Sequence, residues 1–276
     1  MADSGQGRAN HRRFKGLVSE IALNAVSSAA RDGSIVLHGI TLPVHDGELL
    51  VLVGPSGSGK TSVIRAIAGL DRVTTGSVLF DGANVTELGA AHRDVGIVFQ
   101  TQTLFPRFTA RKNVGFPLTI RKMPRDEIRT RVDAESRALR IEEIIERWPN
   151  ELSAGHQQLV QIARALVRVP NVLLLDEPMA HLDIRTRERL RHDLKELQRG
   201  YGVTTVYATN DPVEAMFMAD RIAALEGGRL QQVGRPDELY ARPATTHIAW
   251  LTGPIGFIDA TVERDSEGYW LASSGI

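Results

Sequence analysis

The stretch that decides the fold lies at residues 54–61 and has the sequence Gly54-Pro55-Ser56-Gly57-Ser58-Gly59-Lys60-Thr61. The apolar run LLVLV at residues 49–53 precedes it, and such a run is typical of a buried parallel strand. Residues 62–69 follow with helical periodicity. Glycines let the backbone wrap closely around phosphate oxygens, and the start of a helix favours anions. The pattern Gly-x-x-x-x-Gly-Lys-Thr therefore predicts a phosphate-binding loop, with Lys60 on the phosphates and Thr61 on Mg²⁺.

A second motif places two carboxylates at the end of another apolar strand. The run VLLL at residues 172–175 leads directly into Asp176 and Glu177. A parallel sheet presents its ligand crevice at the carboxyl ends of its strands. Alone, two acids at a strand end are weak evidence, but together with the phosphate loop they predict two roles. Asp176 is expected to hold Mg²⁺ through water, and Glu177 to orient the attacking water or to accept its proton.

The rest of the chain alternates between strand and helix patterns. Strands are predicted at residues 21–23, 35–37, 49–53, 76–80, 94–100, 171–175 and 203–208, and a hairpin at 221–225 and 229–233. Helices are predicted at residues 62–69, 124–141, 153–169 and 184–197. Alternation of this kind favours an α/β fold with a mostly parallel sheet, which consecutive helices interrupt around residues 101–170.

The composition is that of an ordinary globular protein. The chain has 276 residues, 33 Lys and Arg against 33 Asp and Glu, and 42% hydrophobic residues. A net charge of zero disfavours a nucleic-acid-binding protein. The absence of cysteine excludes disulfides, thiolate catalysis and cysteine-ligated metal clusters. No apolar stretch approaches the 18 or more residues of a membrane-spanning helix, so any membrane role is expected to act through partners.

Further motifs follow in a fixed order along the chain. Gln100 comes after the strand pattern of residues 95–99, and Asn210 comes after the strand pattern of residues 203–208. Between them lie Glu151-Leu152-Ser153-Ala154-Gly155-His156-Gln157-Gln158 and, just after the two carboxylates, Ala180-His181-Leu182-Asp183. From about residue 20 to residue 255, this set resembles the phosphate loop, Q-loop, signature, D-loop and switch of the ATP-binding cassette (ABC) ATPases.

The resemblance implies a fold and a division of the chain. The implied fold is α/β, with a P-loop NTPase (RecA-like) core, an N-terminal antiparallel β subdomain, an inserted α-helical subdomain at about 101–170 and a short C-terminal β remnant. We expect a disordered basic tail over residues 1–18, the ABC ATPase domain over 19–243, and a linker with a truncated C-terminal β segment over 244–276. Arg12 and Arg13 weakly resemble an export signal, but the run after them is too polar for one.

The resemblance also assigns roles to residues. The expected catalytic residues are Glu177, Asn210 and Gln100, and the expected Mg²⁺ ligands are Thr61, Gln100 and Asp176. ATP is expected to contact Gly54, Pro55, Ser56, Gly57, Ser58, Gly59, Lys60, Thr61, Ser62, Ser153, Gly155 and Asp183. In this family two subunits pack head to tail, so that each ATP lies between the phosphate loop of one subunit and the signature of the other.

Two further stretches resemble the importer ATPases of the maltose and sugar-phosphate type. They are LFP at residues 104–106 and PDELYARP at residues 236–243. The implied function is that of the nucleotide-binding subunit of an ABC importer, which hydrolyses ATP to drive uptake of a carbohydrate or similar solute. The implied partners are ABC permease membrane subunits, a second ATPase subunit in a homo- or heterodimer, and an external solute-binding protein acting through the permease. No nucleic-acid partner is implied, and the implied location is the cytoplasmic face of the cell membrane, as a peripheral protein.

Four departures from the family pattern keep alternatives open. Ala154 replaces the first signature glycine, Asn210 replaces the switch histidine, and His156 and Leu159 replace Gln and Arg. Residues 15–79 hold no Phe, Tyr or Trp to stack on adenine. These changes favour a weakly hydrolysing, nucleotide-sensing subunit or half of a heterodimeric ABC ATPase. A soluble cassette ATPase of the DNA-repair or translation type, or a small-molecule kinase, fits less well, because insertions or tandem cassettes are missing and the signature is present.

Overall fold

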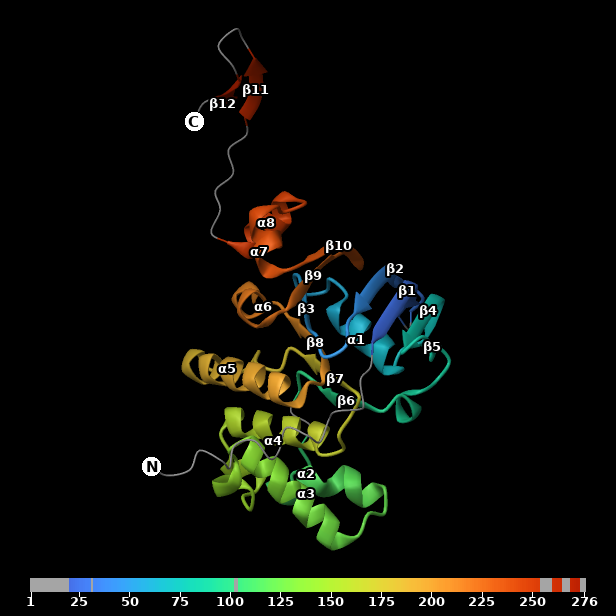
Figure 1. The fold of residues 1–276 in the computed structure, drawn as a ribbon, viewed down its shortest axis with the longest axis vertical. Helices are drawn as coiled ribbons and strands as arrows, with labels where there is room; N and C mark the ends of the chain where they lie inside the picture. The colour runs from blue at the N-terminus through green and yellow to red at the C-terminus, as the bar shows by residue number, and fades with distance from the viewer. Residues whose placement is uncertain (1–19, 31, 102–103, 254–259, 265–268, 274–276) are drawn as a thin grey trace, which may run out of the picture.

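The computed structural model describes residues 20–30, 32–101, 104–253, 260–264 and 269–273. A four-stranded antiparallel sheet has the order β2-β1-β4-β5 and lies on the right of Figure 1, at mid-height. Its strands are β1 (Ile21–Ala29), β2 (Ile35–Val44), β4 (Val73–Phe80) and β5 (Ala83–Asn84). Strands β1, β2 and β4 are longer than the sequence predicted, because bulges let polar and glycine-containing stretches continue the pairing.

The central sheet has six strands in the order β10-β9-β3-β8-β7-β6. Its strands are β3 (Leu49–Val53), β6 (Val95–Val98), β7 (Val172–Asp176), β8 (Thr204–Thr209), β9 (Arg221–Glu226) and β10 (Arg229–Gly234). All neighbours pair in parallel except β10, which forms a hairpin with β9. The predicted mostly parallel sheet is therefore confirmed.

Apolar side chains bury both faces of the central sheet. Every residue of β3, β7 and β8 is buried. In β3, Leu49, Val51 and Val53 belong to one hydrophobic cluster, while Leu50 and Leu52 belong to the other. This alternation follows from the two-residue period of a strand, and it explains why the sequence of β3 is apolar throughout. Helix α1 (Lys60–Ala68) contacts both sheets and fills the second cluster.

The helices of the interrupting segment gather at one end of the molecule (Figure 1). They are α2 (Ala110–Ile120), α3 (Arg125–Ala138) and α4 (Ala154–Leu166), joined through 3-10 turns at Glu142–Ile144 and Pro149–Glu151. Another 3-10 turn, Ala90–His92, precedes β6. Helix α5 (Ile184–Tyr201) lies between these helices and the central sheet in Figure 1. The inserted helical region is thus present as predicted, although α2 was not foreseen.

Helices α6 (Pro212–Met218), α7 (Pro236–Ala241) and α8 (Thr246–Thr252) follow strands β8 to β10. The sequence placed residues 244–252 in a linker, but Ile248 and Leu251 of α8 are buried in the same cluster as the central sheet. Strands β11 (Ala260–Arg264) and β12 (Tyr269–Ser273) form an antiparallel hairpin apart from the two sheets in Figure 1. The expected tail over residues 1–18 lies outside the described residues. Among the residues described, no helix has the length and apolarity needed to cross a membrane.

Candidate active site

The predicted phosphate-loop, magnesium and catalytic residues lie at the ends of four neighbouring parallel strands. Strands β3, β8, β7 and β6 are adjacent in that order. Gly54 follows β3, Asn210 follows β8, Asp176 ends β7 and is followed by Glu177, and Gln100 lies two residues past β6. The fold therefore gathers motifs that are far apart in sequence along one edge of the sheet, where parallel sheets bind ligands.

The glycine-rich loop requires glycine at particular positions. Gly59 has φ +103°, and a Cβ there would lie 2.9 Å from Leu37 Cδ2. A Cβ on Gly54 would lie 2.1 Å from the carbonyl oxygen of Leu225. Gly59 is also the N-cap residue of α1 and offers no side-chain cap, so the first amide N–H groups of α1 remain open to a ligand. This loop forms an anion-binding cradle at the start of a helix.

Lys60 is buried at the base of this loop, with 4% of its surface exposed. Its Nζ donates to the carbonyl oxygens of Gly54 and Pro55 at 2.9 and 3.0 Å. It also lies 3.7 Å from Oε1 of Glu177. Burial lowers the pKa of the Lys60 ammonium, while the charges of Glu177 and Asp176 act in the opposite direction. A bound phosphate would favour the charged lysine.

Oxygen atoms suited to a divalent cation meet beside this lysine. Thr61 Oγ1 donates to Asp176 Oδ1 at 3.0 Å, and Asp176 is 4% exposed. Burial raises the pKa of Asp176, and the hydrogen bond from Thr61 partly offsets that rise. Hydroxyl and carboxylate oxygens are the ligands that Mg²⁺ prefers. The buried Oγ of Ser58 in the loop has no hydrogen-bond partner among the described residues, which fits a loop shaped around a polar ligand.

Glu177 connects the two halves of the site. Its Oε2 accepts a hydrogen bond from Gln100 Nε2 at 3.3 Å, while its Oε1 faces Lys60. Its backbone has φ +44°, a conformation that costs free energy in a non-glycine residue and is common at functional sites. Lys60, Thr61, Gln100, Asp176 and Glu177 thus form one contiguous cluster. Asn210 is exposed at the end of β8, the strand between those that carry Gly54 and Asp176.

The signature and D-loop residues lie at two other helix starts. Ser153 caps α4 by accepting from the backbone of His156 at 3.3 Å, and Asp183 caps α5 by accepting from Thr186 N at 3.0 Å. A Cβ on Gly155 would lie 2.6 Å from Cγ2 of Thr186, so the two helix starts pack closely. In the described part of the chain, no hydrogen bond or ion pair links Ser153, Gly155 or Asp183 to the cluster around Glu177.

The remaining predicted nucleotide contacts belong to the same loop and helix. Pro55, Ser56 and Gly57 are exposed along the loop, and Ser62 lies half-buried in the first turn of α1.

One supporting residue was missed by the sequence argument. Gly228 donates its N–H to Ser58 O at 3.0 Å and accepts from His38 N at 2.9 Å. A Cβ on Gly228 would lie 2.0 Å from Val36 O, so only glycine fits there. Gly227 and Gly228 predicted a turn, but nothing in the sequence indicated that the turn supports the phosphate loop.

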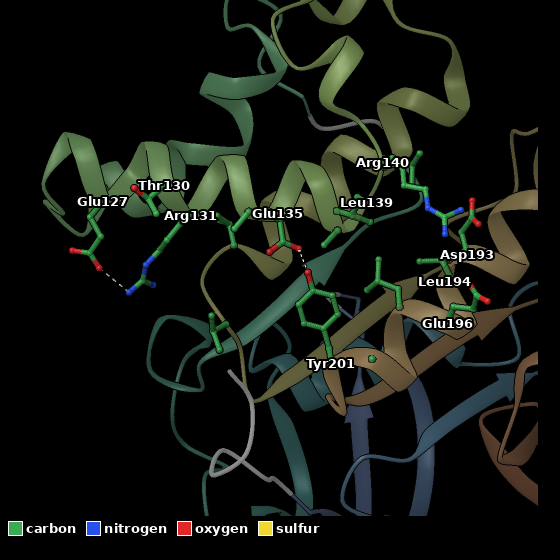
Figure 2. Close-up of a pocket in the computed structure, with 17 residues that line it drawn as sticks. Glu127, Thr130, Arg131, Glu135, Leu139, Arg140, Asp193, Leu194, Glu196 and Tyr201 are labelled. Carbon is green, nitrogen blue, oxygen red and sulfur yellow. Dashed lines mark hydrogen bonds and ion pairs between the residues drawn. The ribbon is translucent and has the colours of Figure 1, made fainter. Parts of the chain in front are cut away.

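A cavity of about 590 Å³ lies elsewhere, between α3 and α5 (Figure 2). Tyr201 donates to Oε1 of Glu135 at 2.8 Å across it. None of the predicted site residues lines this cavity. A smaller cavity of about 250 Å³ lies at the start of α4 and is lined in part by Ser153, Gly155 and His156.

The glycine loop, the buried lysine and the acidic strand end define a P-loop nucleotide-binding fold. Comparison with known proteins narrows this class, since the family model described as ABC transporter matches residues 37–180. The chain belongs to the ABC transporter family, as the ATP-binding cassette component.

Two relatives are similar in sequence over most of the chain. It is 46% identical over 234 residues to the trehalose/maltose import ATP-binding protein MalK of Thermococcus litoralis, covering 82% of this chain and 63% of that protein. It is 43% identical over 236 residues to the sn-glycerol-3-phosphate import ATP-binding protein UgpC of Brucella abortus, covering 86% of this chain and 67% of the relative. The chain thus spans about two thirds of the length of these relatives.

Two solved structures of ABC proteins have a similar fold. CbiO1 of Clostridium perfringens, part of an ABC transporter complex, has a TM-score of 0.75 at 30% identity, over 81% of this chain and 91% of that one. A dimeric ATP-binding cassette in a post-hydrolysis state, bound to ADP and Pi, has a TM-score of 0.69 at 34% identity. That match covers 78% of this chain and 98% of the other. The predicted P-loop NTPase fold and family are therefore confirmed.

Proposed function

We propose that this chain binds Mg²⁺-ATP and hydrolyses it to ADP and phosphate. One observation carries the proposal: Lys60 and Glu177 lie 3.7 Å apart beside the 3.0 Å contact between Thr61 and Asp176. A phosphate-binding lysine, a hydroxyl–carboxylate pair for a hard cation and a further carboxylate are the parts that phosphoryl transfer to water requires.

Each residue of this cluster has a separate role in the proposed reaction. The amide N–H groups at the start of α1 and the Lys60 ammonium bind the β- and γ-phosphates. Thr61, Gln100 and Asp176 would hold Mg²⁺, which neutralises phosphate charge. Glu177 orients a water molecule, whose oxygen forms a bond to the γ-phosphorus while the bond to the bridging β–γ oxygen breaks. The proton that the water loses goes to the Glu177 carboxylate.

We further propose that two subunits share each nucleotide, in a homo- or heterodimer. Ser153 caps a helix of 13 residues, and its hydrogen bonds are confined to its own end of α4. Ser153, Gly155 and Asp183 lie apart from the cluster around Glu177. This separation is explained if the signature of one subunit contacts the nucleotide that is bound to the phosphate loop of the other subunit. The ADP-bound relative described above is a dimer, which supports this arrangement.

The proposed physiological role is solute import. Three aromatic residues that follow Gln100 pack together: Phe105 and Phe116 lie 4.6 Å apart, and Phe105 and Phe108 lie 5.4 Å apart. Phe105 remains 38% exposed, and the guanidinium of Arg164 lies 5.6 Å from its ring. We propose that this surface docks on permease membrane subunits at the cytoplasmic face of the membrane. An external solute-binding protein would deliver a carbohydrate or a similar solute, as the import names of the relatives suggest.

A second candidate function is nucleotide sensing with slow hydrolysis. Asn210 favours it, because a neutral amide at the end of β8 contributes a weaker contact to a phosphate than a charged imidazole. The rate at which the wild-type protein hydrolyses ATP distinguishes nucleotide sensing from hydrolysis that drives import.

The test of the proposed function is Mg²⁺-dependent release of phosphate from ATP by the purified chain, with Lys60→Ala as the loss-of-function variant. Loss of charge-assisted bonds of about 1.5–3 kcal/mol each should weaken nucleotide binding at least about tenfold. Lys112→Ala, at an exposed lysine, should behave like the wild type. Equal nucleotide affinity of the Lys60→Ala variant and the wild type would overturn the assignment.

A further inference from the structure

Helix α5 follows the D-loop, residues 180–183, and its side chains contact the segment that follows Asn210. It begins at its N-cap, Asp183, and one of its faces carries Arg187, Arg191 and Lys195 at four-residue spacing. Arg187 and Arg191 reach Asp211, the N-cap of α6, and Lys195 reaches Phe217 within α6. Because residues four apart lie on one helix face, a single stripe of α5 holds the segment that follows Asn210.

Arg187 contacts both ends of this connection. One of its terminal nitrogens donates to the carbonyl oxygen of Leu182, in the D-loop, at 3.2 Å. The other donates to Oδ2 of Asp211, the residue after Asn210, at 3.3 Å. Its buried Nε lies 3.8 Å from Oε1 of Glu214, an ion pair beyond hydrogen-bond distance. The rigid guanidinium fork therefore bridges the D-loop and the residue that follows Asn210.

The partners of Arg187 are themselves held firmly. Asp211 caps α6, since its Oδ1 accepts from Val213 N at 2.8 Å. Glu214 is 3% exposed, and its Oε2 accepts hydroxyl hydrogen bonds from Tyr207 and Thr209, each at 2.7 Å. Tyr207 and Thr209 belong to β8, the strand that ends beside Asn210. The partners of Arg187 are thus tied by hydrogen bonds to α6 and to the end of β8.

We propose that Arg187 is a positioning residue that couples the D-loop, residues 180–183, to Asn210. This inference rests on the proposed function and adds two premises to it: the second subunit also touches the D-loop, and Asn210 contacts the γ-phosphate. Docking of the partner moves Leu182 and the start of α5, and Arg187 transfers that movement to Asp211 and hence to Asn210. A neutral amide has no long-range charge to compensate for misplacement, so its position decides how well it stabilises the transition state.

A double-mutant cycle on Arg187 and Asp211 tests the coupling. Asn is as good an N-cap as Asp, so Asp211→Asn removes the charge and keeps the cap of α6. We expect Arg187→Ala and Asp211→Asn each to lower kcat about tenfold, with less than about a threefold change in KM. The double variant should be no more than about tenfold slower than the wild type, because each single variant already lacks the 3.3 Å contact between Arg187 and Asp211. The longer pair of Arg191 with Asp211, at 4.0 Å, is lost in Asp211→Asn and kept in Arg187→Ala. A product of the two effects, near a hundredfold, would overturn the coupling. Arg199→Ala, an exposed arginine on the same helix, is the matched control and should keep the wild-type kcat.

A measurement that needs no turnover separates this inference from the proposed function. Hydrogen exchange of the nucleotide-free protein should become faster in Arg187→Ala at residues 180–183 and 209–214 together, and remain unchanged in Arg199→Ala. Arg187→Lys keeps the charge but loses the fork, so it should retain folding and show an intermediate kcat. Faster exchange in one loop alone, or in neither, would contradict the coupling. If the wild type releases no phosphate, the proposed function fails, and the exchange result still decides the role of Arg187.

Discussion

The hydroxyl of Thr61 donates a hydrogen bond to Oδ1 of Asp176 at 3.0 Å, although 115 residues separate the two. The contact joins the first turn of α1 to the end of β7. The phosphate loop and the acidic strand end, which the sequence predicts separately, are therefore joined by a hydrogen bond at the centre of the site. Because Asp176 is buried, the bond also affects the stability of the nucleotide-free protein.

Asp176→Asn should raise the melting temperature of the nucleotide-free protein at pH 7.5. Burial raises the folded-state pKa of Asp176 above its unfolded value, so the stability it contributes when protonated is lost as pH rises through the folded pKa. Asparagine stays neutral and still accepts the hydrogen bond from Thr61. For a domain of this size, Tm rises about 2–4 °C for each kcal/mol gained.

The pH dependence supplies the control. The difference in Tm between Asp176→Asn and the wild type should shrink as pH falls into the acid range, where Asp176 is protonated. Thermal unfolding followed by circular dichroism from pH 4 to pH 8 measures it. A variant that is less stable than the wild type at pH 7.5 would show that the ionised carboxylate stabilises the fold.

Gly155→Ala should destabilise the protein, because the new Cβ would lie 2.6 Å from Cγ2 of Thr186. Overpacking of this kind costs about 1–3 kcal/mol. Thr186→Ser removes the clashing methyl group but keeps the hydroxyl that donates to Asp183 Oδ2 at 2.6 Å. The double variant should therefore recover most of the lost stability in urea unfolding. If Thr186→Ser gives no rescue, the contact with the Thr186 methyl group is not the cause of the lost stability.

Asn210→His should raise ATP turnover about tenfold with little change in nucleotide affinity. Asparagine donates to the charged γ-phosphate as a neutral amide, whereas a protonated imidazole adds a charge of its own to the same bond. A difference of about 1.4 kcal/mol is a factor of ten in rate. The gain requires the water-orienting carboxylate, so it should vanish in a Glu177→Gln background. Steady-state phosphate release measures both, and flat or lower turnover would mean that Asn210 is not a weakened switch.

The contiguous motifs were predictable because local sequence determines them. Glycine spacing defines the loop at residues 54–61, and the apolar run before Asp176 and Glu177 indicates a strand end. Parallel pairing then brings the ends of β3 and β7 to one edge of the sheet. Lys60 Nζ and Glu177 Oε1 consequently lie 3.7 Å apart.

Long-range and context-dependent features were not predictable in this way. Helix α2 continues through Pro117, which normally disfavours the interior of a helix. The support that Gly228 gives to Ser58 depends on how the β9–β10 turn folds back on the loop. The contacts of Arg187 with Leu182 and Asp211 depend on the docking of α5 against α6, which no local pattern encodes.

The most direct test of the account is the oligomeric state of Glu177→Gln in Mg²⁺-ATP. Glutamine keeps the shape and the contact with Gln100 but accepts no proton from water, so nucleotide binds and hydrolysis stops. Size-exclusion chromatography with light scattering should show a dimer with ATP and a monomer with ADP, while the wild type returns to monomer as ATP is consumed. Glu177→Gln that hydrolyses ATP at the wild-type rate, or that stays monomeric with ATP bound, would contradict the account.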